Sequence, residues 1–351
     1  MGMTYAKVAA KNAEKARRLL AHMCLLDSAT PAGHSLGYVY FPVVDAAKKN
    51  KKLPDYVRIV RDGVSGAKSA TTSYPEMLRS ILNGRESSLL ERGYEQLGSI
   101  AIIGSKLRRA KELRVAKALM VSNKSITTVL AKAGPVSGTY RTRKLRYVAG
   151  VRTYDALYRE NNCLFRFDVR KVYFSSKLAY ERARITARAK DGENILVMFA
   201  GAGPFAIEIA KAHPRTHVVA IEINRHGYES MLENIRLNKT PNATAVLGDV
   251  RKACVKYRGF ADRVIMPLPM SSLQFLDEAL FVSKKRATVD IYSFGAAGSA
   301  FEDAWKAIRA HAASRGYRVR LLDKREVRNY SSSEVEVCVE YGLAKSKKRS
   351  T

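Results

Sequence analysis

The stretch ILVMFAGAGPFAIEIA, residues 195–210, decides the fold, together with VVAIEIN at residues 218–224. An apolar run enters a turn that carries Gly201 and Gly203, and a helical pattern leaves the turn. The second apolar run ends in Glu222. Glycines let the backbone approach a ligand at a helix N-terminus, and a carboxylate that closes the next strand can accept both hydroxyls of a ribose. The stretch therefore predicts a site for a nucleotide-type cofactor.

These residues alone leave the cofactor open. Gly201, Gly203 and Ala206 also satisfy the looser dinucleotide fingerprint, so a nicotinamide-dependent enzyme fits them nearly as well as an S-adenosylmethionine-dependent one. A tight strand-to-helix turn that binds no ligand is the third interpretation.

The charge of the chain indicates a polyanionic partner. Among 351 residues, 62 Lys and Arg stand against 32 Asp and Glu, which gives a formal net charge of +30. Nucleic acid is the commonest partner of such a protein. The alternatives are lysines that serve solubility and a protein that binds a membrane surface.

Cysteine and histidine spacing does not favour a metal site. No C-x-x-C pair occurs, and Pro214 separates His213 from His217, so no helix aligns the two imidazoles. We expect reduced thiols, a cytoplasmic location and no metal. The four cysteines are Cys24, Cys163, Cys254 and Cys338. No apolar run is long enough for a membrane span, so a soluble chain is expected.

The patterning predicts three domains. Residues 1–70 read as a small αβ module, in which the N-terminal segment forms a first helix and YVYFPV a strand. Residues 71–164 read as an α+β middle domain with a basic helix at 105–120, and strands are expected within residues 134–174. In residues 165–351, strands alternate with helices and a strand pair closes the pattern, which predicts a doubly wound α/β sheet with an antiparallel edge.

Two further strand ends carry candidate site residues. Asp249 ends the third strand of the α/β unit, where open sheets of this kind bind ligands, and its carboxylate suits an adenine amino group. MPLP at residues 266–269 ends the fourth strand and forms a rigid lip on which a substrate base could dock. Strand termini punctuated by turn residues are the alternative for both.

Several blocks resemble one family in order along the whole chain. They are AEKARRLL with YVYFPV, GTYRTRKLRYVAG, NNCLFRFDVRKVYFSSKLAYERARI, ILVMFAGAGPFAI, AIEIN, GDVR, and DRVIMPLP with FLDEAL. The chain resembles the archaeal and eukaryotic tRNA guanine-N1 methyltransferases that act at position 37. The resemblance implies a class I (Rossmann-like) methyltransferase domain, preceded by a small αβ domain and an α+β RNA-docking domain. It also implies S-adenosyl-L-methionine as cofactor, and tRNA with guanosine at position 37 as partner.

The resemblance assigns catalytic roles to individual residues. The family's proposed base falls on Glu181, which would take the proton of guanine N1. Its arginine, which holds O6 as negative charge develops, falls on Arg141. Alternatives from the residues themselves are a surface ion pair of Glu181 with Arg184 or Lys177, and a phosphate contact of Arg141. Pro267 stands at a position where many members use Asn on the target base.

The binding residues form two groups. By the resemblance, the cofactor would contact Tyr173, Phe199, Gly201, Gly203, Pro204, Phe205, Glu222 and Asp249. We expect the tRNA to contact Lys106, Arg108, Arg109, Arg143 and Pro269. For the cations in the 105–120 helix, a solvated face is an equal alternative.

Departures from the family pattern open further interpretations. Val197 replaces the usual Asp before MFAG, and Lys177 replaces an Arg, which could reduce cofactor affinity. The M-P-L-P form resembles an archaeal branch that also methylates carbon 7 of a wyosine precursor (imG2) at the same nucleotide. The alternative functions are an aminocarboxypropyl transferase on a wyosine precursor and a catalytically silent tRNA-binding protein. We expect a monomer.

Overall fold

The structure is a computed structural model, which describes residues 4–23, 25–27, 32–35, 37–44, 47, 50, 53–61, 74–138 and 142–345. The chain forms two compact units, residues 1–84 and 85–351. The domain limits expected at residues 70 and 164 stay predictions.

The first unit contains a four-stranded antiparallel sheet in the order β2-β3-β1-β4. Its elements are β1 (Thr4–Ala9), α1 (Ala13–His22), β2 (Gly33–Ser35), β3 (Tyr38–Pro42), β4 (Val57–Arg61) and α2 (Tyr74–Ile81). Helix α1 packs Ala16 and Leu20 against the apolar face of the sheet. The sequence prediction of a helix over the whole N-terminal segment is wrong for residues 4–9, because their alternate side chains are buried, as in a strand.

The second unit begins with a mixed sheet in the order β5-β6-β7-β8. Its elements are α3 (Gly84–Ser87), β5 (Leu90–Leu97), β6 (Ile100–Ser105), α4 (Arg109–Ser122), β7 (Thr128–Ser137) and β8 (Thr142–Gly150). Strands β6 and β7 are parallel, and α4 makes the crossover between them.

The basic helix differs from its prediction in two respects. It begins at Arg109 rather than 105, because residues up to Ser105 pair with β5. The helical spacing of the apolar residues predicts that Leu113 is buried, but it is 37% exposed, whereas Glu112 is fully buried and forms an ion pair with Arg146 of β8. The ion pair allows the Glu112 carboxylate to be buried beside the position where the apolar pattern predicts a buried leucine.

A hairpin connects this sheet to the α/β part of the unit. Strands β9 (Asp155–Glu160) and β10 (Cys163–Asp168) are antiparallel, and Phe165 and Phe167 share one apolar cluster with Ile100 of the mixed sheet. The side chain of Asn234 accepts a hydrogen bond from the Arg166 N–H at 2.7 Å. Thus one core spans residues on both sides of the hairpin.

The rest of the unit is a seven-stranded sheet in the order β13-β12-β11-β14-β15-β17-β16. Strands β11 to β15 are parallel, and β17 pairs antiparallel with both β15 and β16. The strands are β11 (Asn194–Val197), β12 (His217–Glu222), β13 (Ala243–Leu247), β14 (Ala261–Met266), β15 (Ser283–Ala296), β16 (Tyr317–Asn329) and β17 (Glu334–Lys345). The expected doubly wound sheet with an antiparallel edge is confirmed.

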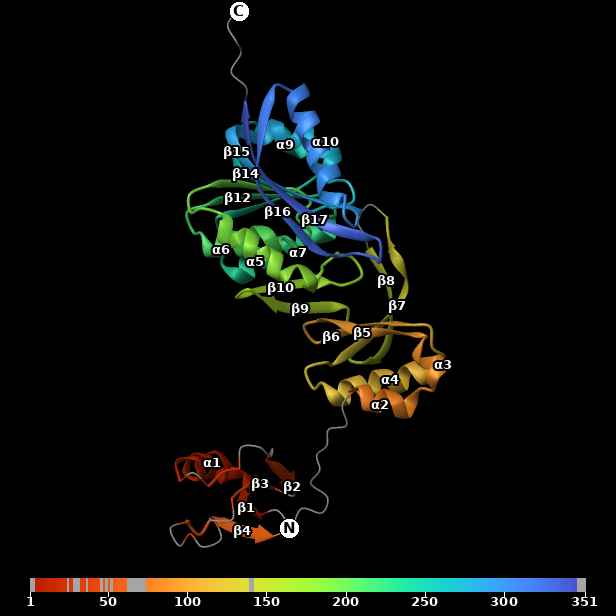
Figure 1. The fold of residues 1–351 in the computed structure, drawn as a ribbon, viewed down its shortest axis with the longest axis vertical. Helices are drawn as coiled ribbons and strands as arrows, with labels where there is room; N and C mark the ends of the chain where they lie inside the picture. Colours follow the sequence, from red (N-terminus) through yellow and green to blue (C-terminus); the bar gives the residue numbers. More distant parts are fainter. Residues whose placement is uncertain are drawn as a thin grey trace, which may run out of the picture. The chain divides into compact units, whose positions relative to one another are not determined.

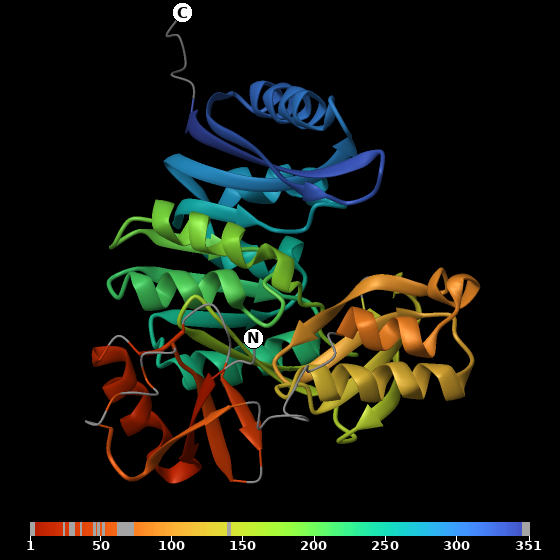
Figure 2. The ribbon, with the colours of Figure 1, turned by 60° about the horizontal axis from the view of Figure 1, so that its bottom comes forward.

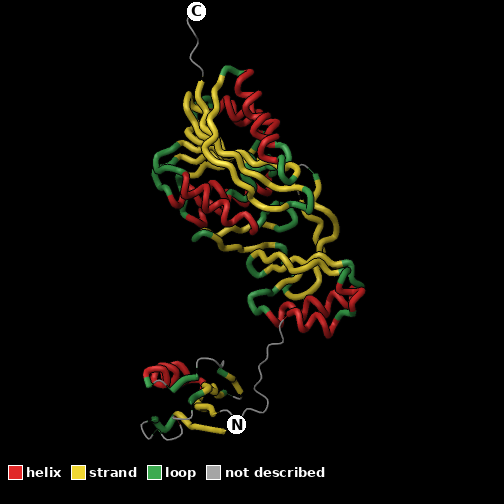
Figure 3. Tube along the Cα trace, in the orientation of Figure 1, coloured by secondary structure: helices red, strands yellow, loops and turns green. Residues whose placement is uncertain are grey.

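Helices cover both faces of this sheet (Figures 1, 2 and 3). One face carries α5 (Ala179–Arg188), α6 (Pro204–Ala212) and α7 (Arg225–Asn238), and the other carries α8 (Val250–Ala253), α9 (Leu276–Val282) and α10 (Ala300–Ser314). Successive residues of β11 alternate between the two cores, since Ile195 and Val197 belong to one and Leu196 to the other. A strand buried on both faces reads as a continuous apolar run, which explains ILVMF.

A buried charged cluster lies where the hairpin, α5 and α6 meet. Arg182 Nη2 donates to Glu160 Oε2 at 2.7 Å, and Arg182 Nε lies 3.6 Å from Glu208 Oε1. All three side chains are at least 96% buried. Burial, and then the negative charge of Glu160, raise the pKa of Glu208 to about 8.

This cluster predicts that stability falls as the pH rises from about 6.5 to about 8.5. In the native state Glu208 holds a proton that the unfolded chain, with an ordinary carboxyl pKa of 4.5, has already released. Raising the pH through the native pKa therefore favours unfolding. This pH range lies above the pKa of Asp290, which burial raises to about 6, so the titration of Asp290 falls mainly below the range. Urea denaturation at both pH values measures the fall, and Glu208→Gln should make it shallower. An equal fall in the variant would assign the effect to other groups.

Candidate functional site

The turn between β11 and α6 has an unusual backbone. Phe199, Gly201 and Gly203 have φ values of +55°, +58° and +85°. A positive φ is uncommon for phenylalanine and typical of functional sites, where surrounding contacts hold the strained residue. Here the Phe199 ring packs edge-on against Phe275 at 4.8 Å. Pro204 occupies the first turn of α6, so the turn directs the helix N-terminus toward the space above the sheet.

Glu222 fastens this turn to the neighbouring strand. Its Oε2 accepts a hydrogen bond from the Gly201 N–H at 2.6 Å, and its Oε1 accepts one from the Asn224 N–H at 2.6 Å. Burial raises the pKa of Glu222, and the backbone donors oppose that rise. Each carboxylate oxygen keeps a lone pair for a further donor, such as a ribose hydroxyl.

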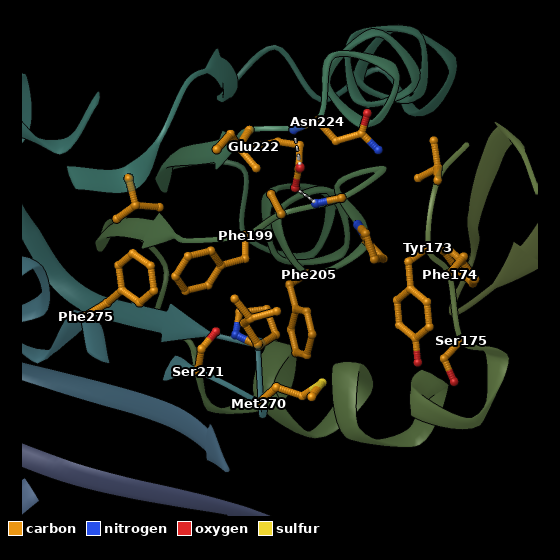
Figure 4. Close-up of a pocket in the computed structure, with 18 of the residues that line it drawn as sticks. Tyr173, Phe174, Ser175, Phe199, Phe205, Glu222, Asn224, Met270, Ser271 and Phe275 are labelled. Atoms are coloured by element: carbon orange, nitrogen blue, oxygen red, sulfur yellow. Dashed lines mark hydrogen bonds between the residues drawn. The ribbon is translucent and has the colours of Figure 1, made fainter. Parts of the chain in front are cut away.

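A cavity of about 390 Å³ opens above these strand ends. Figure 4 shows Tyr173 and Ser175 on one side of it, Phe199 and Phe275 on the other, and Glu222 at one end. The structure brings together most of the residues predicted for cofactor and catalysis. Those that line the cavity are Tyr173, Phe199, Gly201, Pro204, Phe205, Glu222, Asp249 and Pro267. The Asp249 side chain also accepts from the Arg251 N–H and so caps α8.

Some lining residues were not anticipated from the sequence. Phe275, Met270 and Arg182 all face the cavity. Phe275 opens the FLDEAL block, so its place in the family pattern was a usable signal. Met270 follows the MPLP lip directly and is 68% exposed. Arg182 follows Glu181 on α5. Its side chain is oriented by the ion pair with Glu160 of β9, a partner that the sequence does not reveal.

Glu181 lies apart from the cavity. Its side chain is 2% exposed, and Arg184 donates to both carboxylate oxygens, at 2.6 and 3.0 Å. The Tyr292 hydroxyl donates to Oε1 at 2.8 Å. Arg325 Nε lies 3.6 Å from Oε2 as well, so the carboxylate belongs to a buried polar network. Its catalytic role stays a prediction.

Among the described residues, the other predicted positions do not line the cavity. Gly203 caps α6 and packs against α7 rather than lining the cavity. Pro269 accepts a hydrogen bond through its carbonyl from the Phe294 N–H. Arg141 lies outside the described residues. Arg108 and Arg109 are exposed at the start of α4.

Two of the departures from the family pattern lie away from the cavity. Val197 is fully buried in the core between the sheet and α6, so its side chain does not line the cavity. Lys177 lines a second cleft, together with Lys106 and Arg143. Within the described residues no cluster of three potential metal ligands occurs, and none of the helices there is long and apolar enough to cross a membrane.

Comparison with known proteins agrees with this geometry. Residues 156–320 match the TRM5/TYW2 methyltransferase domain, and residues 74–153 match the TYW2 N-terminal domain. The tRNA (guanine(37)-N(1))-methyltransferase Trm5b of Pyrococcus abyssi is 33% identical over 96% of this chain and 98% of its own length. The chain belongs to the TRM5/TYW2 methyltransferase family. Membership confirms the resemblance and the expected fold class, and it decides against the nicotinamide-dependent alternative.

Solved structures support the same relationship. The crystal structure of Pyrococcus abyssi Trm5b gives a TM-score of 0.71 at 30% identity, covering 97% of this chain and 99% of that one. A complex of aTrm5 with tRNALeu gives 0.71 at 25% identity, with 96% and 99% covered. A further relative is identified by its sequence. It is the tRNA 4-demethylwyosine(37)-methyltransferase Taw21 of Saccharolobus solfataricus, which is 32% identical over 57% of this chain and 76% of its own length.

Gly203 allows a test of the packing beneath the site. A Cβ at this position would lie 2.7 Å from Met231 Cγ, in addition to the strain of φ +85°. Gly192 has φ +88° with no atom within 4 Å of such a Cβ. We expect Gly192→Ala to lower the free energy of unfolding by about 1 kcal/mol, and Gly203→Ala by about 2–4 kcal/mol because overpacking is added. Urea denaturation measures both, and equal losses would contradict the packing argument.

Proposed function

We propose that this chain transfers the methyl group of S-adenosylmethionine to N1 of guanosine 37 in tRNA. The observation that carries the proposal is the cavity between Glu222 and the Pro267 lip, in a chain that matches Trm5b along nearly its whole length. The net charge of +30 supports an RNA substrate. The three described cysteines are free thiols, which supports a reducing compartment such as the cytoplasm.

The residues of the cavity fit the cofactor. Glu222 can accept the ribose hydroxyls without losing its backbone donors, because each oxygen has capacity for a second hydrogen bond. Asp249, at the end of β13, can accept from the adenine amino group. Phe199 and Phe275 supply an aromatic wall. The cofactor, when bound, supplies an electrophilic methyl group on its sulfonium.

The target base would enter beside the lip. Position 37 stacks in the anticodon loop, so the base must leave its stack, at a cost of about a few kcal/mol. Pro267 and Met270 line the same cavity as Glu222, so a base docked on the lip shares one enclosed space with the cofactor. Enclosure places the methyl donor and the acceptor nitrogen in contact without intervening water.

We propose Glu181 as the base that takes the N1 proton, and its surroundings set a condition on that role. Arg184 and Tyr292 engage its oxygens, and the side chain is buried. The carboxylate can reach guanine only when binding of the RNA moves it or α5 toward the cavity. Arg141 is proposed to stabilise O6, because its guanidinium donates two hydrogen bonds and keeps its charge.

We expect Glu181→Gln to lower the single-turnover methylation rate by about 10²-fold, because the glutamine cannot take a proton. The dissociation constant of S-adenosylmethionine should stay unchanged. Tyr292→Phe is the matched control, since it removes one hydrogen bond to the same carboxylate and keeps the base. An unchanged rate in Glu181→Gln, or equal losses in both variants, would show that the carboxylate serves only the buried network.

The activity itself is tested with two tRNA transcripts, one with guanosine and one with adenosine at position 37. We expect label from methyl-labelled S-adenosylmethionine only on the guanosine transcript, recovered as 1-methylguanosine by nucleoside mass analysis. Binding of tRNA without label on either transcript would contradict the proposal and favour a silent tRNA-binding protein.

A second candidate function is methylation of the wyosine precursor 4-demethylwyosine, in place of the expected imG2, at the same nucleotide. The similarity to Taw21 favours it, and so does Pro267, whose ring offers an apolar surface and no hydrogen-bond donor to a base. A larger tricyclic base gains more from such a surface than guanine does. Transfer of methyl to tRNA that carries 4-demethylwyosine at position 37 would establish this activity beside the first one.

A further inference from the structure

A second cleft of about 500 Å³ adjoins the cofactor cavity. Tyr173 and Ser175 line both of them. Five cations face the cleft: Lys106, Lys132, Arg143, Lys177 and Arg328. Two carboxylates, those of Glu91 and Glu95, face it as well. We call this space the basic cleft. Its cations come from the mixed sheet, from the segment before α5 and from β16, so the cleft exists only because the fold joins these parts.

The two carboxylates occupy two of the cations. Glu95 forms an ion pair with Arg143, and these side chains are 17% and 15% exposed. Glu91 forms an ion pair with Lys132. A Cβ on Gly104 would collide with the Glu91 carboxyl group, so the glycine leaves room for that side chain in the cleft. Among the ion pairs of the described residues, none involves Lys106 or Lys177. Arg328 forms an ion pair with Glu336, which does not line the cleft. Lys106 and Lys177 therefore leave the cleft with a net positive charge even with these carboxylates in place.

Two arginines connect the cleft to the wall of the cofactor cavity. Arg143 Nη2 donates to the Phe174 carbonyl at 3.4 Å, and its guanidinium lies 5.5 Å from the centre of the Tyr173 ring. Arg328 Nη1 donates to Ser175 Oγ at 3.4 Å. An anion that binds these arginines would thus contact groups that hold residues 173–175, the segment between the two spaces.

We propose that the basic cleft binds the phosphodiester backbone of the RNA next to the target nucleotide, and that Glu91 and Glu95 occupy its cations until the RNA displaces them. The identity of the RNA rests on the proposed function. Planar guanidinium groups bind phosphate oxygens in pairs, and the cleft shares a wall with the cavity that would receive the base. An RNA backbone that is bound in the basic cleft brings the adjacent target nucleotide to the Pro267 lip. This proximity favours RNA over an acidic peptide.

The first test removes the competing carboxylate. With Glu95→Gln, tRNA should bind several-fold more tightly, because the Arg143 cation is no longer neutralised in the free protein. The slope of log affinity against log salt should steepen by about 0.7, the value of one additional phosphate contact on a single strand. Fluorescence anisotropy with labelled tRNA transcript over a salt series measures both. Unchanged or weaker binding would overturn the role of the carboxylate.

The second test removes Lys106 and Lys177, the two lysines of the cleft that pair with no carboxylate among the described residues. Lys106→Ala with Lys177→Ala should weaken tRNA binding about tenfold near 100 mM salt and reduce the slope by about 1.4, or two phosphate contacts. The dissociation constant of S-adenosylmethionine should stay unchanged, because neither lysine lines the cofactor cavity. Lys256→Ala with Lys285→Ala removes the same charge from exposed positions outside the cleft and is the matched control.

The outcomes separate this proposal from the proposed function. If the lysine pair behaves like its control while the wild-type protein methylates guanosine 37, the cleft proposal alone is wrong. If the cleft variants change tRNA binding as expected and no methyl is transferred, the cleft proposal stands and the proposed function fails. A poly-glutamate peptide that binds the wild-type cleft as tightly as tRNA does, measured by competition, would overturn the choice of RNA.

Discussion

The hydrogen bonds of Glu222 to two backbone amides are the interaction on which the site depends. One carboxylate joins the end of β12 to the glycine turn after β11. The turn has three positive φ values, one of them on phenylalanine, and it would relax without partners for its amides. Because Glu222 is buried, its donors must compensate the loss of hydration of a charged group. The glycine turn, the Glu222 carboxylate and the N-terminus of α6 are therefore fixed relative to one another before any ligand binds.

Beneath that unit, buried ion pairs determine how α5 sits on the sheet. Arg182 is held by Glu160 of the hairpin, and Arg184 by Glu181 of its own helix. Both pairs are almost completely buried, and each arginine has a further carboxylate neighbour, Glu208 for Arg182 and Asp323 for Arg184. Such pairs contribute more to a unique orientation than to stability. Helix α5 carries both Arg182, which lines the cavity, and Glu181, the proposed base. Its orientation on the sheet therefore decides where both side chains lie.

The sequence predicted the parts that depend on local patterning. Apolar runs in strands buried on both faces, the Gly201 turn and the carboxylate at Glu222 could all be read directly. The sequence predicted a closing strand pair but not the position of the edge strand β16, because its exposed Arg318 and Arg320 weaken the apolar signal of a strand. The partners of Glu181 could not be predicted either. Tyr292 lies 111 residues away, and only the sheet order brings its hydroxyl to that carboxylate.

The segment 173–175 shows how one short stretch can serve two ligands. Tyr173 and Ser175 face the cofactor cavity and the basic cleft, and Arg143 holds the intervening carbonyl of Phe174. A ligand that fills one space restricts the motion of residues 173–175. The second ligand then has less conformational entropy of this segment to overcome when it binds. Affinity for RNA and for cofactor can thus be coupled without a change of fold. The coupling needs only that Arg143 exchange a carboxylate for a phosphate while it keeps its contact with the Phe174 carbonyl.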